Sequence, residues 1–506
     1  MTKRHGYCMA KRERAIRKPG KIGAALSVLA LLVSCGGDGG GGGGSGSTPA
    51  PPIAGPAPPP PPPANSACSI SERQRWAEEQ IDEWYLFPET LPANRDPSGF
   101  ATVTAYIDSL TATARAQGRD RFFTFLTSIA EENAFFQQGS NAGFGIRLAY
   151  DSANRRLFVS EAFEGAPALA AGIDRGTEIL AIGTNSSDLR SVSDIAASGG
   201  SAALTEALGP SSAGISRALQ VTDSANGTRT LSITKADFDL DPVSPRYGAQ
   251  VIADGGREVG YLNLRTFIET ADPALTSAFD DFRARGITEL IIDFRYNGGG
   301  LVSTAELMGD LLARNRANEI FARLAFRPSK SQSNSVTRFS PRRESVAPTR
   351  IAFIGTGATA SASELVINAF IPFLGPDLAL VGSDTFGKPV GQIAEDRAQC
   401  DDRLRIVAFA TENSAGNADY FDGLAGSVGA TCAAGDDIAF PLGDPRENSV
   451  ARALDFLAGR SCQPITATSS ATGTEAGQAE ALQLRQRTML MPGRPNAAQI
   501  HSPGIF

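Results

Sequence analysis

Two side chains in the second half of the sequence, Ser361 and Lys388, could act together as a nucleophile and a base. Ser361 follows a loop of small residues and opens a segment whose apolar residues recur at helical spacing. Free backbone N–H groups at a helix start favour negative charge, so an oxyanion beside Ser361 would be stabilised there. Lys388 follows an expected strand, and a lysine serves as a base only if burial or neighbours lower its pKa toward neutrality. By position alone, Ser361 is equally an ordinary helix N-cap and Lys388 a surface lysine, and the sequence chemistry leaves both alternatives open.

The small number of histidines limits the kinds of catalytic and metal site that the chain can form. The 506-residue chain has two histidines, His5 and His501, one near each end. A Ser-His-Asp triad, a Cys-His pair or a His-ligated zinc site is therefore not expected in the folded body. No CxxC spacing indicates a metal site, and we expect neither a metal nor a cofactor. A hydrolase built on this chain needs a base other than histidine.

Both candidate residues lie in residues 239–462, where strands and helices alternate, which predicts an α/β core. Strands are expected at 259–264, 289–294, 351–354 and 378–381, and helices at 273–285, 302–313 and from 361 onward. Two units share one design, an apolar strand followed by a small-residue loop and a helix. If the strands are parallel, both loops lie at the same edge of the sheet, where such folds place their sites. The N–H of Ala362, with a second N–H from Gly298 or Gly299, would then form an oxyanion hole.

Three motifs occupy this core region. They are residues 359–364 (TASASE) with Gly382, 385–388 (TFGK) and Gln392; residues 293–300 (DFRYNGGG); and residues 259–262 (VGYL) with Phe267. Together they resemble the signature of the C-terminal processing (tail-specific) proteases of the S41 peptidase group, over roughly residues 68–460. The resemblance implies a crotonase-like core.

The same resemblance assigns roles to particular residues. It implies that Ser361 is the nucleophile, that Lys388 is the general base and that Gln392 orients the lysine amine. Ser363 is the nearest alternative, and Ser361 is favoured because the family's nucleophile stands three residues before the Glu. One position departs from the family: Pro389 follows the lysine where Gly is usual, and because proline fixes φ and lacks an N–H, a stiffer lysine loop is expected.

Residues 140–238 have short strand-like stretches and a different character. A Gly-rich loop is followed by residues 166–173 (APALAAGI) and 176–182 (GTEILAI), and the combination resembles a PDZ domain. The resemblance implies that the loop offers backbone N–H groups to the terminal carboxylate of a peptide, while the next strand pairs with that peptide. The residues expected to bind substrate tails are Gly143, Phe144, Gly145 and Ile146.

The N-terminus has the pattern of an export signal. Residues 1–34 carry eight basic residues and one acidic residue, then an apolar run at 22–33 that is too short to span a bilayer comfortably. The run ends in LVSC, which resembles a bacterial lipobox with Cys35 as the lipid-bearing residue; a short buried helix is the alternative. Residues 35–67, rich in Gly and Pro, are interpreted as a tether. By resemblance, Gly36 after the cysteine favours an outer-membrane position facing the periplasm or the surface.

The two segments on either side of these domains, and the net charge of the chain, give further expectations. Residues 68–139 are expected to be helical, and the polar residues 463–506 are expected to be a disordered tail. The formal net charge of −7 becomes about −14 without residues 1–34, which disfavours nucleic acid as a partner. The expected partners are protein or peptide substrates with free C-terminal tails and, through the lipid, a membrane.

Four of the six cysteines remain after Cys8, in the signal, and Cys35. In an oxidising compartment an even number predicts disulfides, and four cysteines allow three pairings. We expect Cys400–Cys432 as a local loop closure and Cys68–Cys462 as a clasp between the ends of the folded body.

Three functions are compatible with these patterns. The first is a Ser–Lys endopeptidase that acts on C-terminal regions of exported proteins. The second is a catalytically silent tail-binding protein of the same fold, with Lys388 held protonated. The third is a crotonase-like enzyme acting on thioesters, which the export signal disfavours because CoA substrates are cytoplasmic.

Overall fold

The computed structural model describes residues 66–466 and 487–506. The expected signal at 1–34, the lipidation residue Cys35 and nearly all of the tether at 35–67 lie outside the described residues. In the two described ranges, none of the helices combines the length and the hydrophobicity that crossing a lipid bilayer requires.

A six-stranded sheet forms the α/β core. Its strand order is β10-β11-β12-β15-β16-β19; β10 and β11 are antiparallel, and every later pair is parallel. The strands are β10 (Ala249–Asp254), β11 (Arg257–Asn263), β12 (Glu289–Asp293), β15 (Arg350–Gly355), β16 (Leu378–Gly382) and β19 (Ala430–Ala433). The strands β12, β15 and β16 are parallel, so the loops that follow them leave the sheet at one edge.

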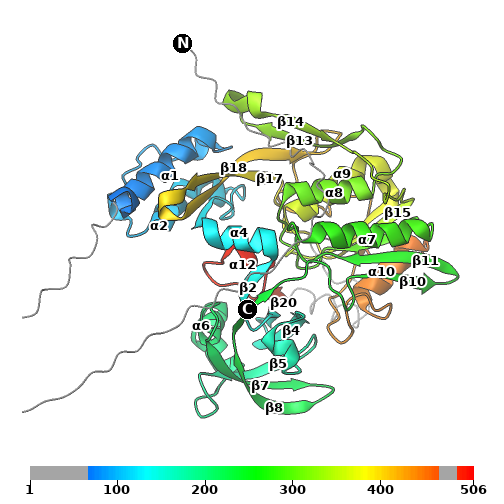
Figure 1. The fold of residues 1–506 in the computed structure, drawn as a ribbon, viewed down its shortest axis with the longest axis horizontal. Coiled ribbons are helices and arrows are strands. Elements are labelled where there is room, and N and C mark those ends of the chain that lie inside the picture. Colours follow the sequence, from blue (N-terminus) through cyan, green and yellow to red (C-terminus); the bar gives the residue numbers. More distant parts are fainter. Residues whose placement is uncertain (1–65, 467–486) are drawn as a thin grey trace, which may run out of the picture. The chain divides into compact units, whose positions relative to one another are not determined.

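Helices cover both faces of this sheet (Figure 1). They are α7 (Ala271–Ala284), α8 (Val302–Leu311) and α9 (Ala362–Leu374) on one face and α10 (Asn448–Leu457) on the other. Leu290 and Ile292 of β12 pack in the cluster with α7, α8 and α9, whereas Ile291 packs in the cluster with α10. Because side chains alternate across a strand, one apolar run fills two core layers.

A second, five-stranded sheet carries the N-terminal helices. Its order is β1-β18-β13-β14, with β17 also paired to β18. The strands are β1 (Phe125–Ser128), β13 (Ile320–Phe326), β14 (Ser335–Arg338), β17 (Val390–Arg397) and β18 (Asp402–Glu412), and the helices are α1 (Ile70–Trp84), α2 (Val103–Leu110), α3 (Ala112–Ala116) and α4 (Ile129–Gln138). Ser69 and Thr102 cap α1 and α2 by accepting backbone N–H groups. Residues 68–139, expected to be helical, contain α1 to α4, and they also contain β1, which adds to β18.

A third sheet is antiparallel throughout, in the order β20-β3-β4-β5-β7-β8 with β6 paired to β5. Its elements are β3 (Ile146–Asp151), β4 (Arg156–Ala162), α5 (Pro167–Ala170), β5 (Glu178–Gly183), β6 (Arg190–Ser191), α6 (Val192–Leu208), β7 (Ser216–Asp223), β8 (Gly227–Thr234) and β20 (Arg487–Met489). A separate antiparallel pair is formed by β2 (Ser140–Gly143), which directly precedes β3, and β9 (Ala236–Asp239), which directly follows β8. This sheet and the separate pair together contain the region from 140 to 238, and the sheet also takes up β20 from the last part of the sequence, which was not expected.

The expectation of a disordered tail at 463–506 is wrong for residues 487–506. These residues form β20 and the helix α12 (Ala497–His501), and α12 lies beside α4 (Figure 1). Leu490, Ile505 and Phe506 are each at most 2% exposed. Burial of these separate apolar residues orders the segment, although they form no periodic pattern.

Both expected disulfide pairings are wrong. The structure pairs Cys68 with Cys400 and Cys432 with Cys462. Cys68 begins the body beside the turn that precedes β18, and the N–H of Ala433 bonds to the carbonyl of Gln463, which brings residue 462 next to the edge strand β19. The contacts between elements set the pairing, and proximity in the sequence does not.

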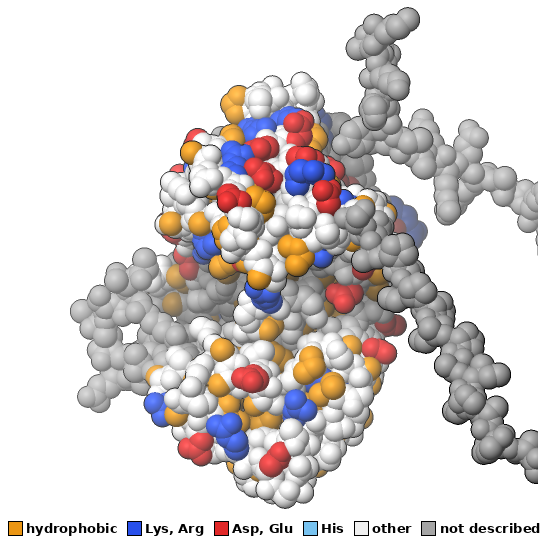
Figure 2. Space-filling model, turned by 90° about the vertical axis from the view of Figure 1, so that its left-hand side faces the viewer, with side chains coloured by type: hydrophobic (Ala, Val, Ile, Leu, Met, Phe, Trp, Pro, Cys, Tyr) orange, Lys and Arg blue, Asp and Glu red, His pale blue; other side chains and the backbone are white. Residues whose placement is uncertain are grey.

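On the face seen in Figure 2, basic and acidic side chains are interspersed among apolar ones, with no broad area of one charge.

Candidate active site

Ser361 lies at the carboxyl edge of the parallel sheet, directly before α9. The loop that leads to it from β15 is held against the neighbouring loop, because the Ala360 N–H donates to the carbonyl of Asn297 at 3.0 Å. Ser361 has a φ of 57°, a left-handed conformation that is uncommon outside glycine. Such strain persists only where the surroundings enforce it, and it concentrates at functional sites.

One buried carboxylate, that of Glu364, joins the serine loop to the lysine loop. Its Oε2 accepts the backbone N–H groups of Ser361 at 3.0 Å and Lys388 at 2.8 Å. Its Oε1 accepts the N–H of Gly387 at 2.7 Å and the hydroxyl of Thr385 at 2.6 Å. Burial raises the pKa of Glu364, and these four hydrogen bonds oppose the rise. A single side chain thus fixes the backbone of both candidate residues.

The Lys388 side chain is only 5% exposed. Its Nζ donates to Gln392 Oε1 at 2.7 Å, and Gln392 Nε2 donates in turn to the carbonyl of Phe123. The amine also lies 4.9 Å from the centroid of the Phe123 ring. Burial lowers the pKa of Lys388 to about 8. The structure therefore brings Lys388 and Gln392 together as expected, with an amine that is substantially neutral in mildly alkaline solution.

Pro389 leaves this arrangement in place. Its carbonyl accepts both the N–H of Thr411, at 2.9 Å, and the Thr411 hydroxyl, at 3.0 Å. The loop is held through a carbonyl, which proline retains, and not through the N–H that it lacks.

The two serines of the motif differ in their surroundings. Ser363 is fully buried, and its hydroxyl donates to the carbonyl of Asn297 at 3.1 Å. Ser361 is only partly buried, at the start of the helix. Ser363 therefore has a structural partner in the neighbouring loop, while Ser361 is the more accessible of the pair.

The glycines expected in the oxyanion hole pack closely against the start of α9. Gly299 has a φ of +105°, and a Cβ there would lie 2.9 Å from the nitrogen of Ala362, so no side chain fits. Its N–H donates to Asn297 Oδ1 at 2.9 Å. The N–H of Gly298 donates to the carbonyl of His501 at 3.0 Å. The structure brings Gly298, Gly299 and Ala362 together, with both glycine N–H groups engaged.

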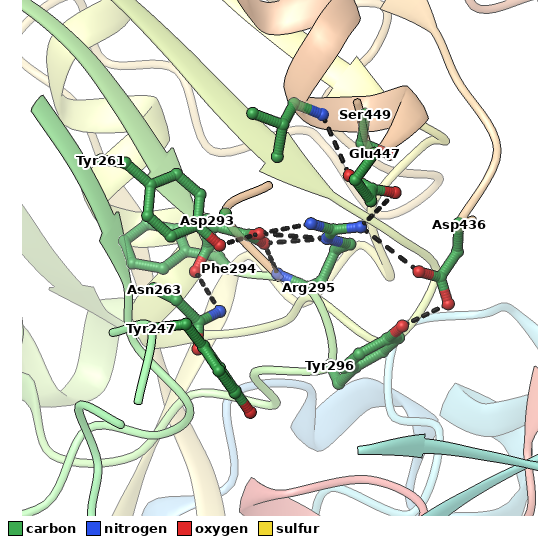
Figure 3. A network of polar contacts seen from close by, with 12 residues as sticks. Tyr247, Tyr261, Asn263, Asp293, Phe294, Arg295, Tyr296, Asp436, Glu447 and Ser449 are labelled. Atoms are coloured by element: carbon green, nitrogen blue, oxygen red, sulfur yellow. Dashed lines mark hydrogen bonds and ion pairs between the residues drawn. The ribbon is translucent and has the colours of Figure 1, made fainter. Parts of the chain in front are cut away.

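Figure 3 shows the ion pairs made by Arg295, which shortly precedes this glycine loop in the sequence. Arg295 pairs with Asp293 at 2.7 Å, with Glu447 at 2.8 Å and with Asp436 at 3.3 Å. The hydroxyl of Tyr296 donates to Asp436. Because Arg295, Asp293 and Glu447 are fully buried, the network holds the base of the loop rigidly.

Two arginines from outside the core reach these loops, and the sequence did not indicate either. Arg121 donates to the carbonyl of Gly387 in the lysine loop. Arg175, just before β5, donates to the Tyr296 hydroxyl at 3.1 Å and pairs with Asp436 at 2.6 Å. Both lie in segments without helical or strand periodicity, so no sequence signal marks them.

The loop expected to bind substrate tails runs from β2 into β3. The N–H groups of Gly145 and Ile146 donate to the main-chain oxygen of Phe506 at 2.9 and 3.2 Å. Phe144 and Ile146 are buried in the same cluster as the Phe506 side chain. A Cβ at Gly143 would lie 2.6 Å from the Phe506 carbonyl carbon. All four residues therefore converge on one end of a peptide segment.

Comparison with known proteins agrees with this geometry. Residues 258–417 match the model of Peptidase family S41. The chain is 26% identical over 278 residues to the chloroplastic C-terminal processing peptidase of Tetradesmus obliquus, covering 51% of this chain and 53% of that protein. It is 25% identical over 278 residues to the carboxy-terminal processing protease CtpA of Bacillus subtilis (strain 168), covering 55% and 54%. The chain thus spans about half the length of the curated relatives it matches.

The fold is similar to the crystal structure of a Bacteroides fragilis NCTC 9343 protein assigned to the S41 proteases. The TM-score is 0.58 at 22% identity, over 76% of this chain and 97% of that one. Residues 258–417, which carry Ser361 and Lys388, therefore match the model of Peptidase family S41, and the fold of the chain is similar to that of an S41 protease.

Proposed function

We propose that the protein is a serine endopeptidase in which Ser361 is the nucleophile and Lys388 is the general base. One observation carries this proposal: a strained serine and a buried lysine of lowered pKa are held by the same carboxylate, that of Glu364. The match of residues 258–417 to the model of Peptidase family S41 and the processing proteases among the relatives support it.

The reaction follows from the arrangement. Neutral Lys388 takes the hydroxyl proton of Ser361 as Oγ attacks a peptide carbonyl. The N–H of Ala362 and one glycine N–H, from Gly298 or Gly299, stabilise the oxyanion once that glycine N–H has left its present acceptor. Protonated Lys388 then gives its proton to the leaving amine, and an acyl ester on Ser361 remains. Water loses its proton to Lys388 as it attacks that ester, and Lys388 then returns the proton to the departing Oγ of Ser361. Gln392 keeps the amine directed through its 2.7 Å hydrogen bond.

Substrate tails are recruited by a PDZ-like domain formed by β3 to β8 with α5 and α6. Two features support this proposal. The loop N–H groups of Gly145 and Ile146 point at a peptide oxygen, and the edge of β3 accepts a further strand. The ligand class is an extended peptide that ends in a free carboxylate and an apolar side chain. Residue Cys35 carries the lipid that attaches the protein to a membrane of the cell envelope.

The test is cleavage of a peptide with an apolar free C-terminus by the wild type and by Ser361→Ala. The proposal requires cleavage by the wild type and none by the variant, with unchanged peptide binding. Binding without cleavage by the wild type would instead identify a catalytically silent tail-binding protein.

A further inference from the structure

The last described residues, 487–506, which we call the tail segment, lie along the groove proposed for substrate tails. β20 pairs antiparallel with residues 149–151 of β3. Residues 504–506 continue this pairing, because the Leu148 N–H donates to the Gly504 carbonyl at 2.8 Å and the Phe506 N–H donates to the Ile146 carbonyl at 2.9 Å. The edge of β3 is therefore already occupied by the same chain.

Phe506 fills the end of this groove. Its main-chain oxygen accepts the N–H groups of Gly145 and Ile146, the position proposed for a substrate carboxylate. Phe506 is 2% exposed and belongs to the same buried cluster as Phe144 and Leu208 of α6. The groove thus holds an aromatic residue in the place proposed for the last residue of a substrate.

The middle of the tail segment covers the candidate active site. The His501 ring packs on Phe135 and Phe136 of α4, with centroids 6.0 and 4.9 Å away. The carbonyl of His501 takes the N–H of Gly298, one of the proposed oxyanion donors. Ile500 and Pro503 line the same cavity, of about 1360 Å³, as Ala360 and Lys388. A substrate that uses the Gly298 N–H must first displace this segment.

A buried arginine links the tail segment to both sites. Arg147 of β3 is fully buried and pairs with Glu161 at 3.1 Å. Its Nη1 donates to the carbonyl of Tyr296, in the glycine loop, at 3.1 Å and also to the carbonyl of Pro503. The same guanidinium therefore holds the tail segment and the loop that carries Gly298.

We infer that the tail segment is an intramolecular ligand of the tail-binding groove, which competes with substrate tails and shields the Gly298 N–H in the resting protein. This inference rests on the proposed function of the groove. A tethered ligand acts at an effective concentration of about millimolar order, so weakening it should raise the apparent affinity for free tails by roughly tenfold or more.

The test uses the full chain carrying Ser361→Ala, so that binding is measured without catalysis. The probe is a fluorescent synthetic peptide that copies residues 497–506 and has a free carboxylate. Phe506→Asp, which places a charge in the apolar pocket, should bind this peptide roughly tenfold more tightly than the parent. Ala225→Asp is the matched control, because Ala225 is exposed in the β7–β8 turn at the opposite edge of the sheet, and its affinity should equal that of the parent.

A second measurement needs no substitution in the groove. Saturating free peptide should increase hydrogen exchange in residues 497–506 of the Ser361→Ala chain, while β3 stays protected by the incoming strand. Equal peptide affinity of Phe506→Asp and the parent, or bound peptide with unchanged exchange of 497–506, would overturn the inference. Peptide cleavage is measured separately, with the chain that keeps Ser361. Absence of cleavage would contradict the proposed function, but it would not affect the result of the binding competition.

Discussion

Ser361 and Lys388, 27 positions apart in the sequence, donate their backbone N–H groups to the same oxygen, Oε2 of Glu364. The shared acceptor fixes the distance between the loop of the proposed nucleophile and that of the proposed base. Neither contact uses the side chain of Ser361 or Lys388, because each residue donates only its main-chain N–H to this oxygen.

Glu364→Gln should therefore damage catalysis more than substrate binding. The glutamine amide would turn an NH₂ group toward hydrogen-bond donors that need an acceptor. The lost hydrogen bonds should cost about 1–3 kcal/mol of stability, and the two loops should shift. We expect kcat to fall by roughly 100-fold, the order expected from a displacement of about 1 Å, with a small change in KM. The control is Glu258→Gln, at an exposed position. Equal kcat for Glu364→Gln and the wild type would show that the shared carboxylate positions nothing.

The pH dependence should report the lysine. The pKa of Lys388 is lowered to about 8 by burial, so kcat/KM should rise with pH and level off above that value. Lys388→Arg should be inactive at every pH, because a guanidinium stays protonated. Activity of that variant above the level of Ser361→Ala would exclude the lysine as the base.

The same pKa makes a prediction about stability. The unfolded chain binds the lysine proton up to about pH 10.4, whereas the folded protein releases it near 8, so protonation favours unfolding. Lys388→Met should remove a penalty of about 3 kcal/mol below pH 8. That gain should shrink as the pH rises from 8 to about 10.4, which thermal unfolding across this range can measure. A stability difference that is independent of pH would rule out the lowered pKa.

The disulfides predict which peptides are linked. Non-reducing digestion should give peptides that join Cys68 to Cys400 and Cys432 to Cys462. Removing either bridge should cost about 2–4 kcal/mol of unfolding free energy. A peptide that links Cys400 to Cys432, or four free thiols in protein exported to the periplasm, would contradict the structure.

Two glycines offer a matched test of the tail-binding loop. Gly145 and Gly165 both have a φ of +75°, but a Cβ at Gly145 would lie 1.9 Å from Ala166 Cβ, whereas nothing lies within 4 Å at Gly165. Alanine brings the same backbone strain at both, so Gly145→Ala should weaken binding of a free-carboxylate peptide far more than Gly165→Ala. An amidated peptide should bind weakly to all three proteins. Similar affinities for both variants would mean that the loop does not hold substrate tails.

The core could be predicted because its strands are buried on both faces. Runs such as Leu290 to Ile292 and Ala379 to Val381 are continuously apolar, which is typical of parallel strands. With those strands placed, the two small-residue loops had to meet at one edge, and Ser361, Lys388 and Gln392 followed from their motifs.

The other features of the fold and the site depend on contacts between residues far apart in the sequence, which local sequence patterns do not reveal. Arg121 reaches the lysine loop from 266 residues away, and Cys68 meets Cys400 across 332. The tail segment is ordered by isolated residues such as Leu490 and Phe506, which show no period. Its composition indicated disorder, and its fit to the edge of β3 and to α4 reverses that expectation.

The most direct test of the central claim is to locate a covalent acyl group. A serine-acylating probe should label the wild type at one site, and peptide mass spectrometry should place the added mass on Ser361. Ser361→Ala should remain unlabelled, and Ser363→Ala should be labelled, because the buried Ser363 hydroxyl is bonded to Asn297. Labelling that persists in Ser361→Ala and disappears in Ser363→Ala would contradict the account.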